Sequence, residues 1–260
     1  MKYELPLIEA TLVRRYKRFL ADVILADGSE ITVHCPNTGS MKHCAEPGSR
    51  VWLSDSANPA RKYRYSWEWV EVNGKYRACI NTTRANQLVK EALEARQIPT
   101  LDTWQTLQSE PKVDDGRLDF CLHGECLHGE QSVTDNESRR CWVEVKSVTL
   151  LGLPEEDALE TDQKDNKSRS RMGYFPDAVT ARGLKHLHRL LALHQSGERA
   201  VLLFCVPHEG IREVMAAATI DPKYAQALRE VAEQGVEVMA FSVLFNDNEM
   251  RLSEPLPVYL

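Results

Sequence analysis

The sequence predicts a two-domain α+β protein, with a small all-β domain over residues 1–82 and an α/β domain over residues 83–260. Three observations predict it. Short β-type segments separated by tight turns fill the first eighty residues. Helical periodicity begins after Asn81 and then alternates with apolar, strand-like runs. The charge balance also changes from basic to acidic near the same point.

Composition is that of a soluble globular protein. Of the 260 residues, 43% are apolar and 27% are charged, and the net charge is −6. Residues 1–85 hold 13 Lys/Arg against 9 Asp/Glu, a balance of +4, and the remainder holds 19 against 29, a balance of −10. The net charge alone argues against a nucleic-acid partner, but a basic first part is typical of a module that faces phosphates.

No segment predicts secretion or a membrane partner. Lys2, Glu4 and Glu9 place charges at the N-terminus with no apolar run behind them, and the longest apolar run, residues 200–206, is too short to span a bilayer. The seven cysteines have no regular spacing, so no disulfide framework is expected. We therefore expect a cytoplasmic protein.

Five strands are expected in the first domain. They cover residues 11–25, 30–34, 50–53, 64–72 and 75–80. Asp27-Gly28, Pro47-Gly48 and Asn73-Gly74 supply turns beside them. Five strands, small closing turns and one long loop over residues 35–46 predict a five-stranded OB-type β-barrel, although other small barrels would give much the same pattern.

The second domain alternates helices and strands. Helices are expected over residues 85–95, 178–194 and 224–234, and strands over residues 116–120, 141–148, 200–206 and 236–245. The polar stretch over residues 152–172 predicts a long loop. A helix-turn-helix over residues 224–238 would indicate a transcription factor, but Gly235 followed by alternating apolar residues favours a helix and then a strand.

Two neighbouring strands of this domain carry the candidate catalytic residues Asp119, Glu144 and Lys146. Residues two apart in a strand share a face, so Glu144 and Lys146 point the same way while Val143 and Val145 pack behind them. Mg²⁺ prefers oxygen ligands, and Asp119 and Glu144, with the carbonyl of Val145, provide them. Lys146 would orient a metal-activated water or stabilise charge on a phosphodiester. The bland alternative is a solvated strand face.

Other charged residues are candidates for a supporting role. Glu110 precedes the Asp119 strand, and Glu91 lies on the preceding helix. Asp177, Arg182 and His186 gather at the start of a later helix, where Arg182 and His186 share a face because they are four residues apart. The expected cofactor is Mg²⁺ or Mn²⁺, and no organic cofactor is expected.

A tandem repeat separates the two key strands. Cys121-Leu122-His123-Gly124-Glu125 is followed at once by a second copy over residues 126–130. The Cys and His residues raise the possibility of zinc, but their spacing matches no usual zinc pattern. A lengthened loop is the better interpretation.

Two basic, aromatic stretches in the first domain are the candidate nucleic-acid surface. Aromatic platforms flanked by cations suit single-stranded nucleic acid. Trp67 and Trp69, by contrast, are expected in the barrel core, since a small barrel must fill its interior. The candidate contact residues are Arg14, Arg15, Lys17, Arg18, Arg61, Lys62, Tyr63 and Arg64.

Ordered motifs along nearly the whole chain resemble those of the sugar fermentation stimulation protein A family of bacteria and archaea. They include Tyr16-Lys17-Arg18-Phe19, His34-Cys35-Pro36-Asn37-Thr38-Gly39-Ser40-Met41, Arg117-Leu118-Asp119-Phe120, Val143-Glu144-Val145-Lys146-Ser147 and Tyr174-Phe175-Pro176-Asp177. The loop after Thr149 and the loop with the tandem repeat are longer than the family pattern, and residues 111–115 depart from it.

The resemblance implies a fold and a function. The family joins an N-terminal OB-type domain to a PD-(D/E)xK nuclease-like domain, in which Asp119, Glu144 and Lys146 occupy the nuclease-type positions. Its members are described as DNA-binding proteins, without marked sequence preference, linked to regulation of sugar and notably maltose metabolism. The first hypothesis is therefore a DNA-binding regulator, and the alternative is an active Mg²⁺- or Mn²⁺-dependent nuclease.

Overall fold

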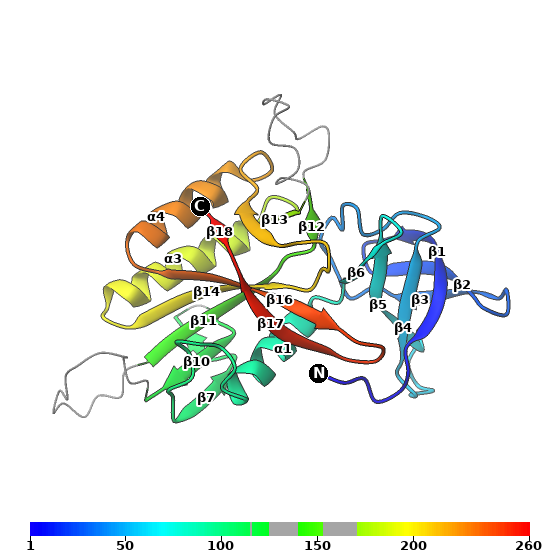
Figure 1. Ribbon diagram of the computed structural model, residues 1–260, viewed down its shortest axis with the longest axis horizontal. Coiled ribbons are helices and arrows are strands. Elements are labelled where there is room, and N and C mark those ends of the chain that lie inside the picture. The colour runs from blue at the N-terminus through cyan, green and yellow to red at the C-terminus, as the bar shows by residue number, and fades with distance from the viewer. Residues whose placement is uncertain (115, 125–139, 153–170) are drawn as a thin grey trace.

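The computed structural model describes residues 1–114, 116–124, 140–152 and 171–260. Figure 1 shows a β-barrel at one end of the molecule and an α/β domain at the other, which confirms the predicted fold class. The strands of the first domain are β1 (Ile8–Tyr16), β2 (Leu20–Leu25), β3 (Glu30–His34), β4 (Arg50–Asp55), β5 (Tyr65–Val72) and β6 (Tyr76–Cys79).

Strands β1 to β5 close the barrel. They pair in the order β3-β2-β1-β4-β5, and a parallel contact between His34 and Ser66 joins β3 to β5. Strand β6 extends the sheet beyond β5, outside the closed ring. The five-stranded barrel is therefore confirmed, but its members differ from the strands expected from the sequence.

The single strand expected over residues 11–25 is wrong, because the chain reverses at Lys17 and Arg18. Both have left-handed backbone, with φ of 49° and 63°, although neither residue type signals such a turn. The guanidinium of Arg15 donates to the carbonyl of Arg18 at 2.8 Å, and the N–H of Cys35 donates to the carbonyl of Phe19 at 2.8 Å. Tertiary contacts thus stabilise a turn that the local sequence does not mark.

A bulge in β5 changes which way its aromatic residues point. Trp52 pairs with Trp69 and the next residue, Leu53, pairs with Trp67, so Glu68 is left over between them. Trp67 therefore packs inside the barrel, whereas Trp69 faces outward and packs with Tyr3 and Phe245 at ring separations of 5.6 and 5.2 Å. Trp69 is fully buried, but its expected place in the barrel core is wrong.

The bulged Glu68 is buried and joins three parts of the chain. Its two carboxylate oxygens accept hydrogen bonds from Tyr3, Ser54, Asn81 and Arg84 at 2.8 to 3.1 Å. These partners come from the N-terminal segment, from β4, and from residues 81–84, where the chain passes from the barrel into the second domain. The carboxylate thereby fixes how the barrel meets that domain.

The second domain is built on one six-stranded sheet. Its order is β17-β16-β14-β11-β10-β7, with β11, β14 and β16 parallel and the others antiparallel to their neighbours. These strands are β7 (Thr106–Ser109), β10 (Phe120–His123), β11 (Arg140–Ser147), β14 (Arg199–Val206), β16 (Glu237–Phe245) and β17 (Met250–Leu256).

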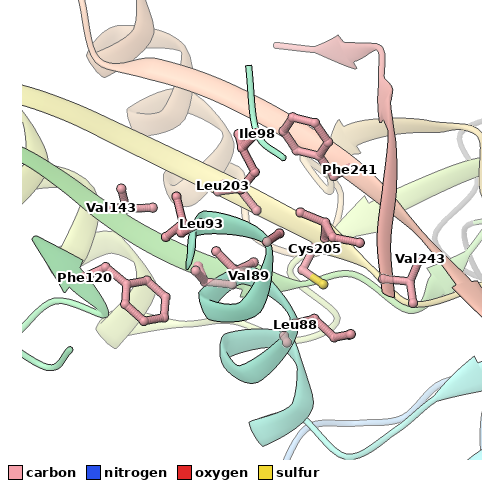
Figure 2. Packing of buried hydrophobic residues seen from close by; sticks show 14 of the residues in the cluster. Leu88, Val89, Leu93, Ile98, Phe120, Val143, Leu203, Cys205, Phe241 and Val243 are labelled. Atoms are coloured by element: carbon pink, nitrogen blue, oxygen red, sulfur yellow. The ribbon is translucent and has the colours of Figure 1, made fainter. Parts of the chain in front are cut away.

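Helices cover both faces of this sheet. Helix α1 (Thr83–Glu94) packs Leu88, Val89 and Leu93 against one face, as Figure 2 shows. Helices α3 (Ala181–Gln195) and α4 (Pro222–Glu233) pack against the other face. Successive residues of a strand point to opposite faces, so β11 turns Val143 and Val145 toward α1 and Trp142 and Glu144 toward α3.

Short strands complete the domain. They are β8 (Lys112–Val113) with β9 (Gly116–Arg117), and a small sheet of β12 (Leu150–Leu151), β13 (Met172–Phe175), β15 (Glu213–Ala216) and β18 (Val258–Tyr259).

Several expectations on individual segments are settled by these elements. Helix α4 is followed by strand β16, so the helix-turn-helix alternative is wrong. Six cysteines in the described residues are free and buried. The second copy of the Cys-Leu-His-Gly-Glu repeat, and most of the polar stretch over 152–172, lie outside the described residues. Among the described helices, none has the length and apolar character needed to cross a membrane.

Replacement of the buried Glu68 tests its role at the domain junction. Glu68→Ala should lower the free energy of unfolding by about 3–5 kcal/mol, because it leaves Arg84 and three neutral partners without their acceptor. Urea unfolding followed by tryptophan fluorescence measures this. Glu94→Ala, which removes the exposed Lys90–Glu94 pair, is the control and should cost less than about 0.5 kcal/mol. Equal losses in both variants would contradict the assignment.

Candidate functional site

The pairing of β10 with β11 brings Asp119 beside Glu144. The ladder pairs Phe120 with Val143, so one step further along the two strands Asp119 lies opposite Glu144. Strand β10 begins at Phe120, so Asp119 is the residue immediately before the strand and not part of it. The two carboxylates predicted to act together are thus neighbours at one end of this strand pair.

Asp119 is held by two donors. Its Oδ1 accepts a hydrogen bond from the amide of Asn86 at 2.6 Å, and its Oδ2 accepts one from the N–H of Val145 at 2.7 Å. Burial, and then the negative charge of Glu144, raise the pKa of Asp119 above its ordinary value. The two hydrogen bonds and the positive charge of Lys146 act to lower the pKa of Asp119, but burial and Glu144 outweigh them.

Glu144 is buried, with 2% of its surface exposed. Its Oε1 accepts hydrogen bonds from the ammonium of Lys146 and from Nδ1 of His186, whereas its Oε2 has no hydrogen-bond partner among the residues that the structure describes. Burial acts to raise the pKa of Glu144, but the hydrogen bond from His186 and the charge of Lys146 outweigh it and lower the pKa below its ordinary value. The anionic form of Glu144 is accordingly favoured, and both of its described donors bind Oε1.

Lys146 and His186 complete this cluster. The Lys146 ammonium lies 3.2 Å from Nδ1 of His186, which comes from the buried face of α3. Thr180 caps that helix by accepting the N–H of Gly183 at 3.0 Å, and this fixes the turn that carries His186. Of the predicted supporting residues, His186 is the one that the structure brings into contact with the candidate catalytic residues.

The other supporting candidates lie elsewhere. Glu91 pairs with the amino group of Met1 at 2.5 Å, and Glu110 is exposed and pairs with Arg117 at 3.0 Å. Asp177 bonds to the barrel, accepting from the hydroxyl of Ser40 at 2.9 Å. Arg182 is exposed one helical turn before His186.

Asn86 is the site residue that sequence reasoning missed. It lies on α1, three residues after the helix begins, and fixes the position of Asp119. A polar amide among the apolar positions of that helix was the available signal, but an exposed helix residue gives the same pattern. Its importance depends on α1 packing across the sheet beside β10.

Donor chemistry at the site suits a hard divalent cation. Among the described residues no three Asp, Glu, His or Cys side chains form a metal-ligating group, but two carboxylates with waters suffice for Mg²⁺. Oε2 of Glu144 is a buried, negatively charged oxygen that has no donor within the described part of the chain. The N–H of Val145 points from the edge of β11 toward Asp119. In an extended strand the N–H and the C=O of one residue point the same way, so the carbonyl of Val145 also faces Asp119.

Some of the candidate nucleic-acid residues are bonded within the fold, and the others are exposed on barrel loops. Arg15 is used within the fold, since its guanidinium donates to the carbonyls of residues 18, 37, 39 and 40. Arg14 and Arg64 pair with Asp22 and Asp55. Tyr63 is half-buried beneath the ammonium of Lys62 at 5.5 Å. Exposed cations remain at two barrel loops, namely Lys17 with Arg18 and Arg61 with Lys62.

Family models match both domains of the chain. The sugar fermentation stimulation protein RE domain matches residues 83–249, and the SfsA N-terminal OB domain matches residues 13–80. The chain belongs to the sugar fermentation stimulation protein family. The family resemblance expected from the sequence motifs is therefore confirmed.

Relatives in the sugar fermentation stimulation protein family are similar over most or nearly all of their length. Homologs from Marinomonas sp. (strain MWYL1) and Pseudoalteromonas translucida (strain TAC 125) are each 47% identical, over 100% and 99% of this chain and 91% and 99% of theirs. The structure of Pyrococcus furiosus SfsA in complex with Ca²⁺ aligns with a TM-score of 0.79 and 25% identity, over 100% of this chain and 98% of that one.

Thermal unfolding with and without a divalent cation tests the carboxylate pair in this family member. Ca²⁺, Mg²⁺ or Mn²⁺ at about 100 times its dissociation constant should stabilise the protein by about 2.7 kcal/mol, reversibly with EDTA. Asp119→Asn should lose this gain, because it removes one of the two anionic ligands. Glu110→Gln, which changes an exposed carboxylate outside the site, should keep it. A gain of equal size in Asp119→Asn would refute this cation site.

Proposed function

We propose that the protein binds DNA without marked sequence preference and holds a divalent cation at Asp119 and Glu144, beside Lys146. One observation carries the proposal. Glu144 is a buried anion next to a second carboxylate, and its Oε2 has no donor among the described residues. Two such carboxylates are costly to bury together unless a cation joins them.

Comparison with Pyrococcus furiosus SfsA supports a divalent cation as a ligand of this protein, and we place it at the two carboxylates. That protein is described in complex with Ca²⁺, and its chain shares this fold over its whole length. Ca²⁺ and Mg²⁺ both take oxygen ligands, and we propose Mg²⁺ or Mn²⁺ as the ion in the cell. Asp119 and Glu144 would supply carboxylate oxygens, and Val145 would supply its carbonyl.

The cations of the chain account for attraction to DNA despite its net charge of −6. Lys17, Arg18, Arg61 and Lys62 are exposed on barrel loops and are free to meet phosphates. Phosphate contacts dominate affinity without reading sequence, which agrees with binding that has little sequence preference. We propose in turn that DNA binding in the cytoplasm underlies a role in regulating sugar, notably maltose, metabolism.

A second candidate is an active Mg²⁺- or Mn²⁺-dependent nuclease of PD-(D/E)xK type. The position of Lys146 favours it, since its ammonium is held by Glu144 and His186 at a cleft instead of extending into solvent. A bound cation would lower the pKa of a coordinated water. Lys146 would stabilise negative charge at a phosphodiester, and Asn86 would keep Asp119 in place.

Salt dependence tests DNA binding. Fluorescence anisotropy with a labelled oligonucleotide should show log affinity falling with log salt, by about 0.9 for each phosphate contacted. Lys17→Ala and Arg18→Ala should each reduce the magnitude of this slope by about 1. Lys90→Ala, whose ammonium already pairs with Glu94, should leave the slope unchanged. Binding that does not respond to salt would rule out the barrel loops as the contact surface.

Plasmid relaxation separates the two candidates. With Mg²⁺ or Mn²⁺ the nuclease candidate predicts conversion of supercoiled to nicked or linear DNA, and EDTA should stop it. Asp119→Ala and Glu144→Ala should each lower the rate by at least about a hundredfold, as expected when groups that stabilise transition-state charge are lost. Cutting that survives both substitutions would exclude this site, and DNA binding without any cutting would leave the first candidate.

A further inference from the structure

A cleft of about 230 Å³ opens between the two domains beside Lys146. Thr38 and Gly39, from the loop after β3, form one wall. Asn86 on α1, Lys146 on β11 and Tyr174 on β13 are among the residues that line the rest. The cleft therefore exists only because the barrel lies against the second domain, and it leads to the candidate cation site through Lys146 and Asn86.

The barrel wall of this cleft is fixed in place. Asp177 accepts hydrogen bonds from the hydroxyl of Ser40 at 2.9 Å and from the N–H of Met41 at 3.1 Å. The backbone of Gly39 approaches so closely that a Cβ there would lie 2.9 Å from Oδ2 of Asp177. On the other side, Arg15 donates to the carbonyl of Gly39 at 2.9 Å. The loop over residues 37–40 thus bridges the domains and closes one side of the cleft.

Besides Asp177, whose carboxylate already accepts from Ser40 and Met41, the lining combines three kinds of chemistry. Tyr174 and Phe175 contribute aromatic surface, Thr38 and Ser147 contribute hydroxyls, and Lys146 contributes a positive charge. A nucleotide presents the same three requirements, in its base, its sugar and its phosphate. The volume is below the range of about 300–1,000 Å³ that drug-sized ligands occupy, and so fits one such unit better than several.

We propose that this cleft receives one unpaired nucleotide and places the adjoining phosphate at Lys146. The inference rests on the DNA binding proposed above and narrows it to single-stranded, frayed or flipped-out DNA. A paired nucleotide would have to bring its complementary strand against the loop over residues 37–40, which the contacts of Asp177 and Arg15 hold in place. An unpaired nucleotide enters alone, at the cost of its stacking.

A series of DNA ligands tests this inference on the unmodified protein. Anisotropy in the presence of Ca²⁺ would compare one sequence as a single strand, as a blunt duplex, and as a duplex with a single-nucleotide bulge. The single strand and the bulged duplex should bind about tenfold more tightly than the blunt duplex, the effect of roughly one stacked base. A 2-aminopurine placed at the bulge should change its fluorescence on binding, because the base enters the cleft.

Filling the cleft provides the matched variant. Thr38→Trp should abolish the tenfold preference, so that the single strand and the bulged duplex bind no more tightly than the blunt duplex. Thr106→Trp makes the same change on the exposed strand β7, away from the cleft, and should keep the preference. Equal affinity of the wild-type protein for all three ligands would overturn the cleft assignment alone. Absence of binding to any of them at low salt would instead overturn the proposed function.

Discussion

Glu68 is the bulged residue of strand β5, with no partner in β4, and its carboxylate accepts hydrogen bonds from Tyr3, Ser54, Asn81 and Arg84. The same bulge turns Trp69 out of the barrel and onto Phe245 of the second domain. One extra residue in a strand therefore supplies both a polar and an apolar attachment between the domains. Without it Trp69 would point into the barrel and this attachment to Phe245 would be lost.

Charge at the candidate site is balanced only in part. Lys146 and His186 both bind the same oxygen of Glu144, while Asp119 is stabilised by neutral donors. Burial and the nearby charge of Glu144 make ionisation of Asp119 more costly, and the pKa of Asp119 is raised as a result. Natural proteins retain such costly groups mainly where they bind or react. A divalent cation would relieve the repulsion, which connects the electrostatics to the proposed function.

The sequence predicted the regular alternation of strands correctly, but it did not predict which side chains contact each other in the folded protein. Alternation in residues 141–148 correctly put Glu144 and Lys146 on one face, because a strand has a fixed period of two. The same rule failed for Trp67 and Trp69, because a bulge resets the period and has no reliable signature. The turn at Lys17 and Arg18 was missed since Arg15 and Cys35, rather than a glycine, stabilise it. Arg15 was likewise expected to meet DNA, yet its donors are used by the barrel's own carbonyls.

By itself, the sequence determined the α+β class, the barrel followed by an α/β domain, the family, and the strand pair that carries Asp119, Glu144 and Lys146. These depend on periodicity, turn residues and ordered motifs, all of which are local. Only the tertiary structure decided that His186 and Asn86 complete the site while Glu91 and Glu110 lie apart from it. It also decided that the barrel loop closes a cleft beside Lys146. Such contacts join residues far apart in the chain, and packing of whole elements, which no local pattern encodes, sets the distances between them.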